Sequence, residues 1–176
     1  MQIHDVKEIR MEIFDEALEM VLIHEGGYID DPHDRGGETK YGISKRAYPD
    51  VDIKNLTTAQ AGEIYRTDYW DKCHCDSLPS GVSIQLFDTA INCGVSRASK
   101  FLQECVGATV DGKIGKQTLA AVKDTYDDIG SDLIQKYTDR REKYYRSLKQ
   151  YNRYGRGWSR RNKETHEKAM EWEETF

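Results

Sequence analysis

Long apolar runs are absent from this chain of 176 residues, and none approaches the ~18 residues of a membrane-spanning helix. That absence excludes an integral membrane protein. Proline is also scarce, at three residues, and no low-complexity tract occurs, which argues against a long linker. Hydrophobic residues make up 38% of the chain and charged residues 32%. Because the apolar residues cluster at helical spacing, the composition indicates a folded protein rather than a disordered one.

Cysteine is limited to four residues, and their spacing excludes a standard zinc finger. Cys73 and Cys75 are separated by one residue, whereas a zinc-binding pair has about two to four. We therefore expect reduced thiols, and a disulfide pair or an adventitious metal site is the alternative. The first twelve residues contain three acidic side chains and no apolar segment of the kind found in signal peptides. We expect synthesis in the cytoplasm, so any action outside the cell needs another exit route.

Periodic apolar residues predict a mostly α-helical fold with a minor β element. The segment 28–44 is rich in Gly and Asp and predicts a short hairpin, with its turn at Gly36-Gly37. Thr57 begins a capping-box pattern, and Ser80 is expected to cap the following helix. Helices are expected at residues 11–25, 57–70, 80–94, 96–107, 115–124, 131–151 and 161–174.

One carboxylate interrupts the apolar face of the first predicted helix. Phe14, Leu18 and Val21 share that face, and the next position on it is Glu25. An inward position removes water from the carboxylate, and the end of the helix places it beside the negative end of the dipole. Both effects favour the protonated form, so we expect a raised pKa for Glu25. Such a group is the general acid that glycosidic cleavage needs near neutral pH. A solvated residue at a helix end is the alternative.

The segment after this helix supplies further polar side chains. Gly26-Gly27 turns the chain, and Asp34 and Thr39 follow in a loop that must fold back toward Glu25. Two carboxylates across a cleft are the basic equipment of a glycoside hydrolase, and a threonine could position a water molecule. Asp and Thr also bond to nearby backbone in turns, so a structural role is the alternative. The His and Asp spacing here fits neither a zincin nor an EF-hand, and no metal site is expected.

Ordered motifs run through most of the chain: His24-Glu25-Gly26-Gly27-Tyr28, Asp31-Pro32, Asp34, Gly36-Gly37-Glu38-Thr39, Tyr41-Gly42-Ile43, Asn55-Leu56-Thr57, Asp68-Tyr69-Trp70, Phe87-Asp88-Thr89-Ala90-Ile91-Asn92-Cys93-Gly94 and Val110-Asp111-Gly112-Lys113-Ile114-Gly115. Together they resemble glycoside hydrolase family 108, a family of lysozyme-like muramidases that includes phage endolysins. Some relatives are labelled secretion activators. The resemblance implies a lysozyme-like helical domain with a small β-hairpin lobe at residues 11–106. It also implies a predicted peptidoglycan-binding helical region at residues 107–176, packed on the first as one globule.

The same resemblance implies an activity and a catalytic set. The family members cleave the β-1,4 bond between N-acetylmuramic acid and N-acetylglucosamine in bacterial peptidoglycan, without a cofactor. The resemblance implies that Glu25 is the catalytic acid. The spacing also resembles the Glu, Asp and Thr arrangement of phage lysozymes, which implies roles for Asp34 and Thr39. Action at the cell wall, after release or export, is then expected.

Five further residues are predicted to bind the glycan: Tyr28, Tyr41, Tyr69, Asp88 and Asn92. Aromatic faces pack well against sugar rings, and tyrosine hydroxyls add polar contacts. Asp88 and Asn92 are four residues apart, so they share a helical face and could reach hydroxyl or N-acetyl groups. The alternatives are ordinary packing for the tyrosines and a buried hydrogen-bonding pair for Asp88 and Asn92.

Charge is distributed unevenly along the chain, whose net charge is −5. Residues 135–168 contain twelve Lys and Arg against four Asp and Glu, with Tyr and Trp interleaved. This region could contact the anionic wall or form a solvated helix, and it matches no nucleic-acid-binding motif, so nucleic acid is an unlikely partner. Two other functions stay open: a wall-binding or secretion-accessory protein without catalysis, and a metal-dependent peptidase.

Overall fold

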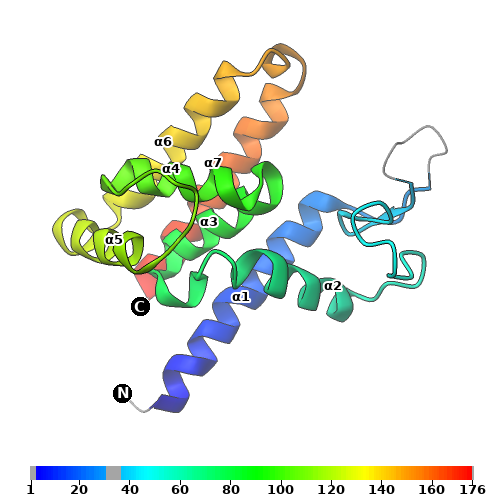
Figure 1. Ribbon diagram of the computed structural model, residues 1–176, viewed down its shortest axis with the longest axis horizontal. Coiled ribbons are helices and arrows are strands. Elements are labelled where there is room, and N and C mark those ends of the chain that lie inside the picture. The colour runs from blue at the N-terminus through cyan, green and yellow to red at the C-terminus, as the bar shows by residue number, and fades with distance from the viewer. Residues whose placement is uncertain (1–2, 31–36, 176) are drawn as a thin grey trace.

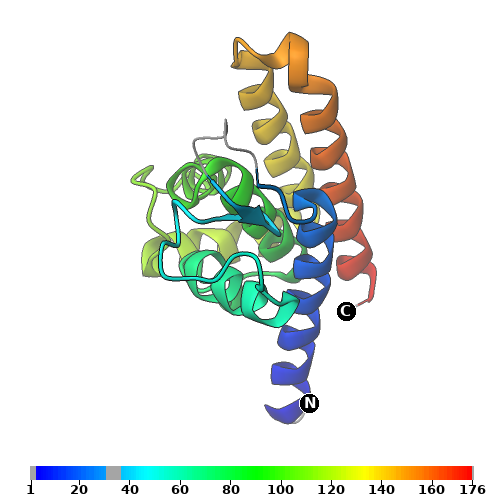
Figure 2. The same cartoon turned by 90° about the vertical axis from the view of Figure 1, so that its right-hand side faces the viewer.

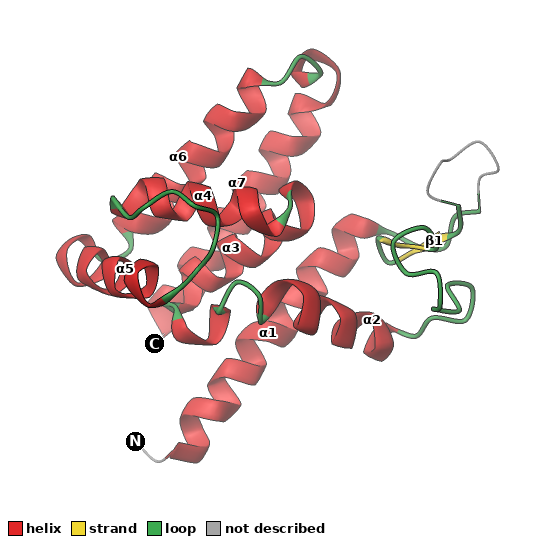
Figure 3. Ribbon diagram, viewed as in Figure 1, coloured by secondary structure: helices red, strands yellow, loops and turns green. Residues whose placement is uncertain are grey.

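The computed structural model describes residues 3–30 and 37–175. Its elements are mostly α-helical (Figure 3), and the predicted combination of helices with a small β-hairpin is confirmed. In chain order they are α1 (Ile3–Glu25), β1 (Thr39–Lys40), β2 (Ile43–Ser44), α2 (Thr58–Tyr65), the π-helical turn η1 (Arg66–Trp70), the 3-10 turn η2 (Cys75–Ser77), α3 (Ser80–Cys93), α4 (Val95–Val106), α5 (Lys116–Ile129), α6 (Asp132–Ser147) and α7 (Tyr151–Thr175).

Helix α3 is the centre of the fold. Every residue from Gly81 to Ala90 is buried, because α1, α4, α6 and α7 pack around it. The long helices α6 and α7 form a hairpin that projects from one side of this group, and the β-hairpin lies beyond the end of α1 (Figure 1). A helix covered on all sides needs apolar residues on all sides, which the sequence of α3 largely provides.

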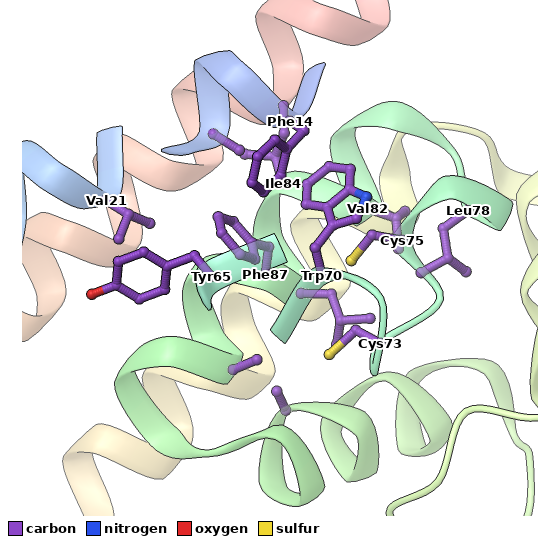
Figure 4. Packing of buried hydrophobic residues seen from close by; sticks show 14 of the residues in the cluster. Phe14, Val21, Tyr65, Trp70, Cys73, Cys75, Leu78, Val82, Ile84 and Phe87 are labelled. Atoms are coloured by element: carbon purple, nitrogen blue, oxygen red, sulfur yellow. The ribbon is translucent and has the colours of Figure 1, made fainter. Parts of the chain in front are cut away.

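Aromatic rings connect α1, η1 and α3 in the core. The ring of Trp70 lies 5.2 Å from that of Phe14 and 5.3 Å from that of Phe87, both in edge-to-face arrangements. Tyr65 packs on the other side of Phe87, beside Val21 (Figure 4). Edge-to-face pairs add to the stability already gained by burying the rings. This cluster fixes the second half of α1, from Phe14 to Val21, against η1 and α3.

The start of α1 and the cap of α3 differ from those expected. Helix α1 begins at Ile3 rather than at residue 11, because the Arg10 guanidinium donates to the Leu78 carbonyl at 2.7 Å and Ile9 packs against the core. Thr57 caps α2 with the expected capping box. Helix α3, in contrast, has Pro79 at its N-cap and no side-chain cap, so the prediction for Ser80 was wrong.

The hairpin turn and the start of α7 were also predicted wrongly. The turn lies at Tyr41-Gly42, where both residues have positive φ (51° and 76°), rather than at Gly36-Gly37. Gly36 is outside the described residues. Helix α7 begins at Tyr151, although Gly155 and Gly157 weaken helix propensity. Packing against α6 compensates.

One buried apolar cluster extends from Ile13 in α1 to Ala169 in α7. It includes side chains from both sides of the domain boundary expected at residues 106 and 107, and that division stays a prediction. Cys73, Cys75, Cys93 and Cys105 are free. No helix in the described part of the chain is long and apolar enough to cross a membrane.

Candidate functional site

Glu25 is the last residue of α1, and the chain leaves the helix through Gly26, whose φ is +76°. The chain then returns beside the helix end. The backbones of Ile29 and Thr39 exchange two hydrogen bonds of 2.8 Å. Because Ile29 is only four residues after Glu25, this pairing holds β1 beside the end of α1. The side chain of Glu25 is 24% exposed. A partly exposed carboxylate at this position is accessible to a ligand and also restricted by its neighbours.

The β-hairpin packs directly onto Glu25. A Cβ atom added to Gly42 would lie 2.9 Å from Cγ and Oε2 of Glu25 and 2.6 Å from the hydroxyl of Tyr65. The Tyr65 hydroxyl donates to the carbonyl of Tyr41 at 2.5 Å, which ties the turn to α2. Burial and the nearby Glu25 carboxylate raise the pKa of Tyr65. Glycine is therefore required at position 42 both for its positive φ and for the close approach.

Arg161 of α7 connects Glu25 to the interior. Its Nη1 atom lies 2.7 Å from Oε1 of Glu25, while its Nη2 atom lies 2.9 Å from Oδ1 of Asp88 and its Nε atom donates to the same carboxylate. A planar guanidinium can hold two carboxylates in fixed positions because its donors form a rigid fork. Glu25 is thus oriented by a residue of α7.

Asp88 is fully buried and has three side-chain partners. Besides Arg161, Nη1 of Arg141 lies 2.7 Å from Oδ2, and the Thr165 hydroxyl donates to Oδ2 at 3.1 Å. Burial by itself would raise the pKa of Asp88, but the two guanidinium groups outweigh it and hold the pKa at about 2. Asp88 therefore contacts Arg161 rather than solvent, and supports the residue that orients Glu25.

Asn92 lies on the same side of α3 but has other partners. Its Oδ1 atom accepts a hydrogen bond from the Tyr145 hydroxyl, which in turn accepts one from Nε of Arg141 at 2.8 Å. The residue is exposed. Through Tyr145 and Arg141, Asn92 is joined to Asp88, and it remains accessible to a ligand.

Two polar contacts connect α1 and α7 further along their lengths. Nε2 of His24 lies 3.3 Å from Oε2 of Glu164, and the Lys168 ammonium lies 2.8 Å from Oε2 of Glu16. The partners on α7 run in the opposite direction to those on α1, so the helices are antiparallel here, and they lie side by side in Figure 2. These contacts fix the register in which Arg161 reaches Glu25.

The predicted aromatic residues are placed differently from one another. Tyr28 is 41% exposed and donates to Oε1 of Glu38 at 2.9 Å. That hydrogen bond, with smaller contributions from burial and nearby charge, raises the pKa of Tyr28 to about 12. Tyr41 occupies the hairpin turn and is partly buried, as is Tyr69, whose ring packs 5.6 Å from that of Tyr65. Tyr28 is therefore exposed three residues after Glu25, and Tyr41 lies next to Gly42, which packs on Glu25. The sugar contacts of the three tyrosines stay predictions.

The second predicted catalytic carboxylate, Asp34, lies outside the described residues. Thr39 is in β1, partly buried, and its hydroxyl donates to the carbonyl of Gly37. The catalytic roles of both residues stay predictions. Among residues 3–30 and 37–175, no group of three or more His, Cys, Asp and Glu side chains is arranged to hold a metal ion.

Neither arginine of the site was identified from the sequence, although a local signal existed for Arg141. Leu133, Ile134, Tyr137, Arg141 and Tyr145 form the buried face of α6. An arginine in such an apolar face must have a buried anionic partner. Applied to Arg141, this reasoning would have predicted a partner such as Asp88.

Comparisons with known proteins identify two family models and a solved structure that this chain resembles. The family model described as "Glycosyl hydrolase 108" matches residues 18–94. The model described as "Predicted Peptidoglycan domain" matches residues 97–163. The solved structure of Brucella abortus SagA is 36% identical, has a TM-score of 0.79, and is matched over 91% of this chain and 95% of that chain. None of the curated proteins compared with this chain matches it.

Proposed function

Because the chain belongs to the glycosyl hydrolase 108 family, we propose that it is a muramidase that cleaves the β-1,4 bond between N-acetylmuramic acid and N-acetylglucosamine. The chain is a glycoside hydrolase with a lysozyme-like, mostly α fold and a peptidoglycan-binding portion. We place its action at the bacterial cell wall, after release or export. The bond cleaved and the residues that cleave it are the proposal.

The observation that carries the proposal is the setting of Glu25. Its carboxylate is 24% exposed, is packed against Gly42, and is oriented by Arg161. A general acid must stand at hydrogen-bonding distance from the leaving oxygen in a fixed orientation, and these contacts provide that restraint. In the proposed reaction, protonated Glu25 donates to the glycosidic oxygen.

Arg161 has a defined part in this step. The guanidinium is anchored on Asp88 by its Nε and Nη2 atoms, so it stays in place whether or not Glu25 is charged. When Glu25 gives up its proton, the resulting carboxylate lies beside a fixed positive charge. Groups that are already oriented toward a charge that develops in the reaction are the ones that stabilise it effectively. Asp34 and Thr39 are the proposed partners that stabilise the sugar cation or align water.

The test is reducing-end analysis of digested, purified peptidoglycan with the wild type and Glu25→Gln. The amide retains the shape of the side chain but cannot donate the proton. We expect the wild type to release reducing ends, and the variant to be slower by about 10² to 10⁴-fold while it keeps its helical circular dichroism and its binding to walls. Full activity of Glu25→Gln would remove this residue from the mechanism. A wild type that binds walls without releasing reducing ends would instead establish the non-catalytic alternative.

A further inference from the structure

One face of α7 continues from Arg161 toward the tip of the α6–α7 hairpin. Four residues share one side of this helix, because each lies three or four positions from two of the others: Tyr154, Gly157, Trp158 and Arg161. We call these four residues the α7 face. From Tyr154 to Arg161 the helix rises about 10 Å. This face leads from the Glu25–Arg161 ion pair into the projecting hairpin seen in Figure 1.

The aromatic members of the α7 face pack on each other, Trp158 partly buried and Tyr154 exposed. The Trp158 ring stacks on buried Tyr145 with a centroid distance of 5.5 Å and an interplanar angle of 28°. Tyr154 packs 5.8 Å from Trp158 and is 47% exposed. The exposed part of the Tyr154 ring, together with the edge of Trp158, offers aromatic surface to a ligand. Such surfaces suit the apolar faces of pyranose rings.

Gly157 gives a second, independent indication of a ligand. Glycine weakens a helix interior, and a Cβ atom at this position would meet nothing within 4 Å. Neither packing nor a positive φ therefore requires glycine here. On the helix surface, Gly157 lies between Tyr154, three residues before it, and Arg161, four residues after it. The missing side chain exposes backbone at the middle of the α7 face. Close approach of a ligand to this backbone would explain why residue 157 is a glycine.

Charge favours a ligand that carries carboxylates. Arg153 and Arg156 are exposed, and within the described ranges neither has a carboxylate at ion-pair distance. The Arg153 guanidinium lies 5.1 Å from the centre of the Tyr154 ring. Sugars that bear carboxylates and attached peptides therefore complement this side of the hairpin better than uncharged glycans do.

We propose that the α7 face binds the glycan strand of peptidoglycan next to the bond cleaved at Glu25. A sugar ring packs on Tyr154 and Trp158, its substituents approach the backbone at Gly157, and carboxylates of the strand face Arg153. The proposal rests on the function proposed above. It makes the C-terminal portion a wall of the substrate site rather than a separate anchor, because Arg161 belongs to the same face and contacts Glu25.

The test uses soluble, uncross-linked glycan strands and three variants of the full chain. Tyr154→Ala removes an exposed ring, and Gly157→Gln fills the gap with a residue that favours helix. Asn152→Gln is the matched control, since it introduces the same side chain at another exposed position of α7. We expect KM to rise about threefold to tenfold in the first two variants, with kcat within about twofold of wild type, and no change in the control. A thermal unfolding midpoint of Gly157→Gln at or above that of wild type would exclude loss of folding as the cause.

Binding is measured separately from catalysis. The same strands are titrated calorimetrically into Glu25→Gln, with and without Tyr154→Ala or Gly157→Gln. The measured affinity reports on binding to the α7 face whether or not Glu25 is the catalytic acid. Weaker binding of both double variants supports the proposal. Unchanged KM and unchanged binding overturn it and leave the proposed hydrolysis standing. Loss of binding to insoluble walls alone, with normal kinetics on soluble strands, also overturns it, because that result describes a separate anchor.

Discussion

Asp88 couples the stability of the fold to pH, and this coupling can be measured by substitution. Its pKa is about 2, against an ordinary value of 3.8, because two guanidinium groups outweigh the effect of burial. This difference corresponds to about 2 kcal/mol of stability, since one pKa unit is about 1.36 kcal/mol. A carboxylate whose pKa is lowered by folding contributes this stability in full when the pH is above its pKa in the unfolded chain. The contribution is lost as the pH falls from about 4 toward 2.

Asp88→Asn should therefore destabilise the protein in a pH-dependent way. At pH 6 the substitution leaves the buried guanidinium of Arg141 without its charged partner, which costs about 3–5 kcal/mol. At pH 2 to 2.5 the wild type has lost most of the unfolding free energy that ionised Asp88 contributes at pH 6. The difference in unfolding free energy should then shrink by about 2 kcal/mol. Urea denaturation of both proteins, followed by circular dichroism between pH 2 and 7, measures this difference directly.

The comparison needs a control because other carboxylates also titrate in this range. Asp52 is exposed, and its hydrogen bonds to Asn55 lower its pKa without any buried partner. Asp52→Asn should show a small difference from wild type at every pH. A difference between wild type and Asp88→Asn that stays constant from pH 7 to pH 2 would refute the reasoning, because it would mean that Asp88 is not held ionised by the two arginines.

Two other predictions concern the contacts of Glu25. Gly42→Ala combines backbone strain at a φ of +76° with close contact to Glu25 and Tyr65, so it should lose more stability and more hydrolysis than Gly107→Ala. Gly107 also has a positive φ but nothing within 4 Å of an added Cβ, so equal losses in both variants would show that only strain matters. Arg161→Lys should lower kcat at least about tenfold in reducing-end assays, because an ammonium cannot hold both Glu25 and Asp88. Near-normal kcat in this variant would mean that positive charge alone suffices.

The position of Glu25 could be predicted from the sequence because the information is local. The apolar stripe of α1 and the glycines that follow it are all within about one helix length, and the helix ends where the stripe indicates. Arg161 could not be identified in the same way, because 136 residues separate it from Glu25. Which helix packs beside α1 depends on the whole arrangement around α3, which no local pattern contains.

Helix α7 shows why local propensity misplaced a boundary. The sequence predicted a helix only from residue 161, and Gly155 and Gly157, which weaken helix propensity, lie just before that residue. In the structure the helix starts at Tyr151, because Trp158 stacks on Tyr145 and the Ser159 hydroxyl donates to Glu142 at 2.8 Å. Tertiary packing can repay the cost of about 1 kcal/mol per helical glycine. The hairpin turn was missed for a similar reason, since a tyrosine seldom adopts positive φ unless its surroundings require it.

The ion pairs of the site argue that the two matched segments form one functional unit. Glu25 and Asp88 lie in the segment that matches the glycosyl hydrolase model, whereas Arg141 and Arg161 lie in the segment that matches the peptidoglycan model. If the segments were separated, Asp88 would lose both guanidinium partners and Arg141 would lose its carboxylate, and unpaired buried charges are strongly destabilising. Glu25 would also lose the guanidinium group that orients it. In the function proposed above, substrate binding by the second segment and catalysis by the first would therefore be coupled through Arg161.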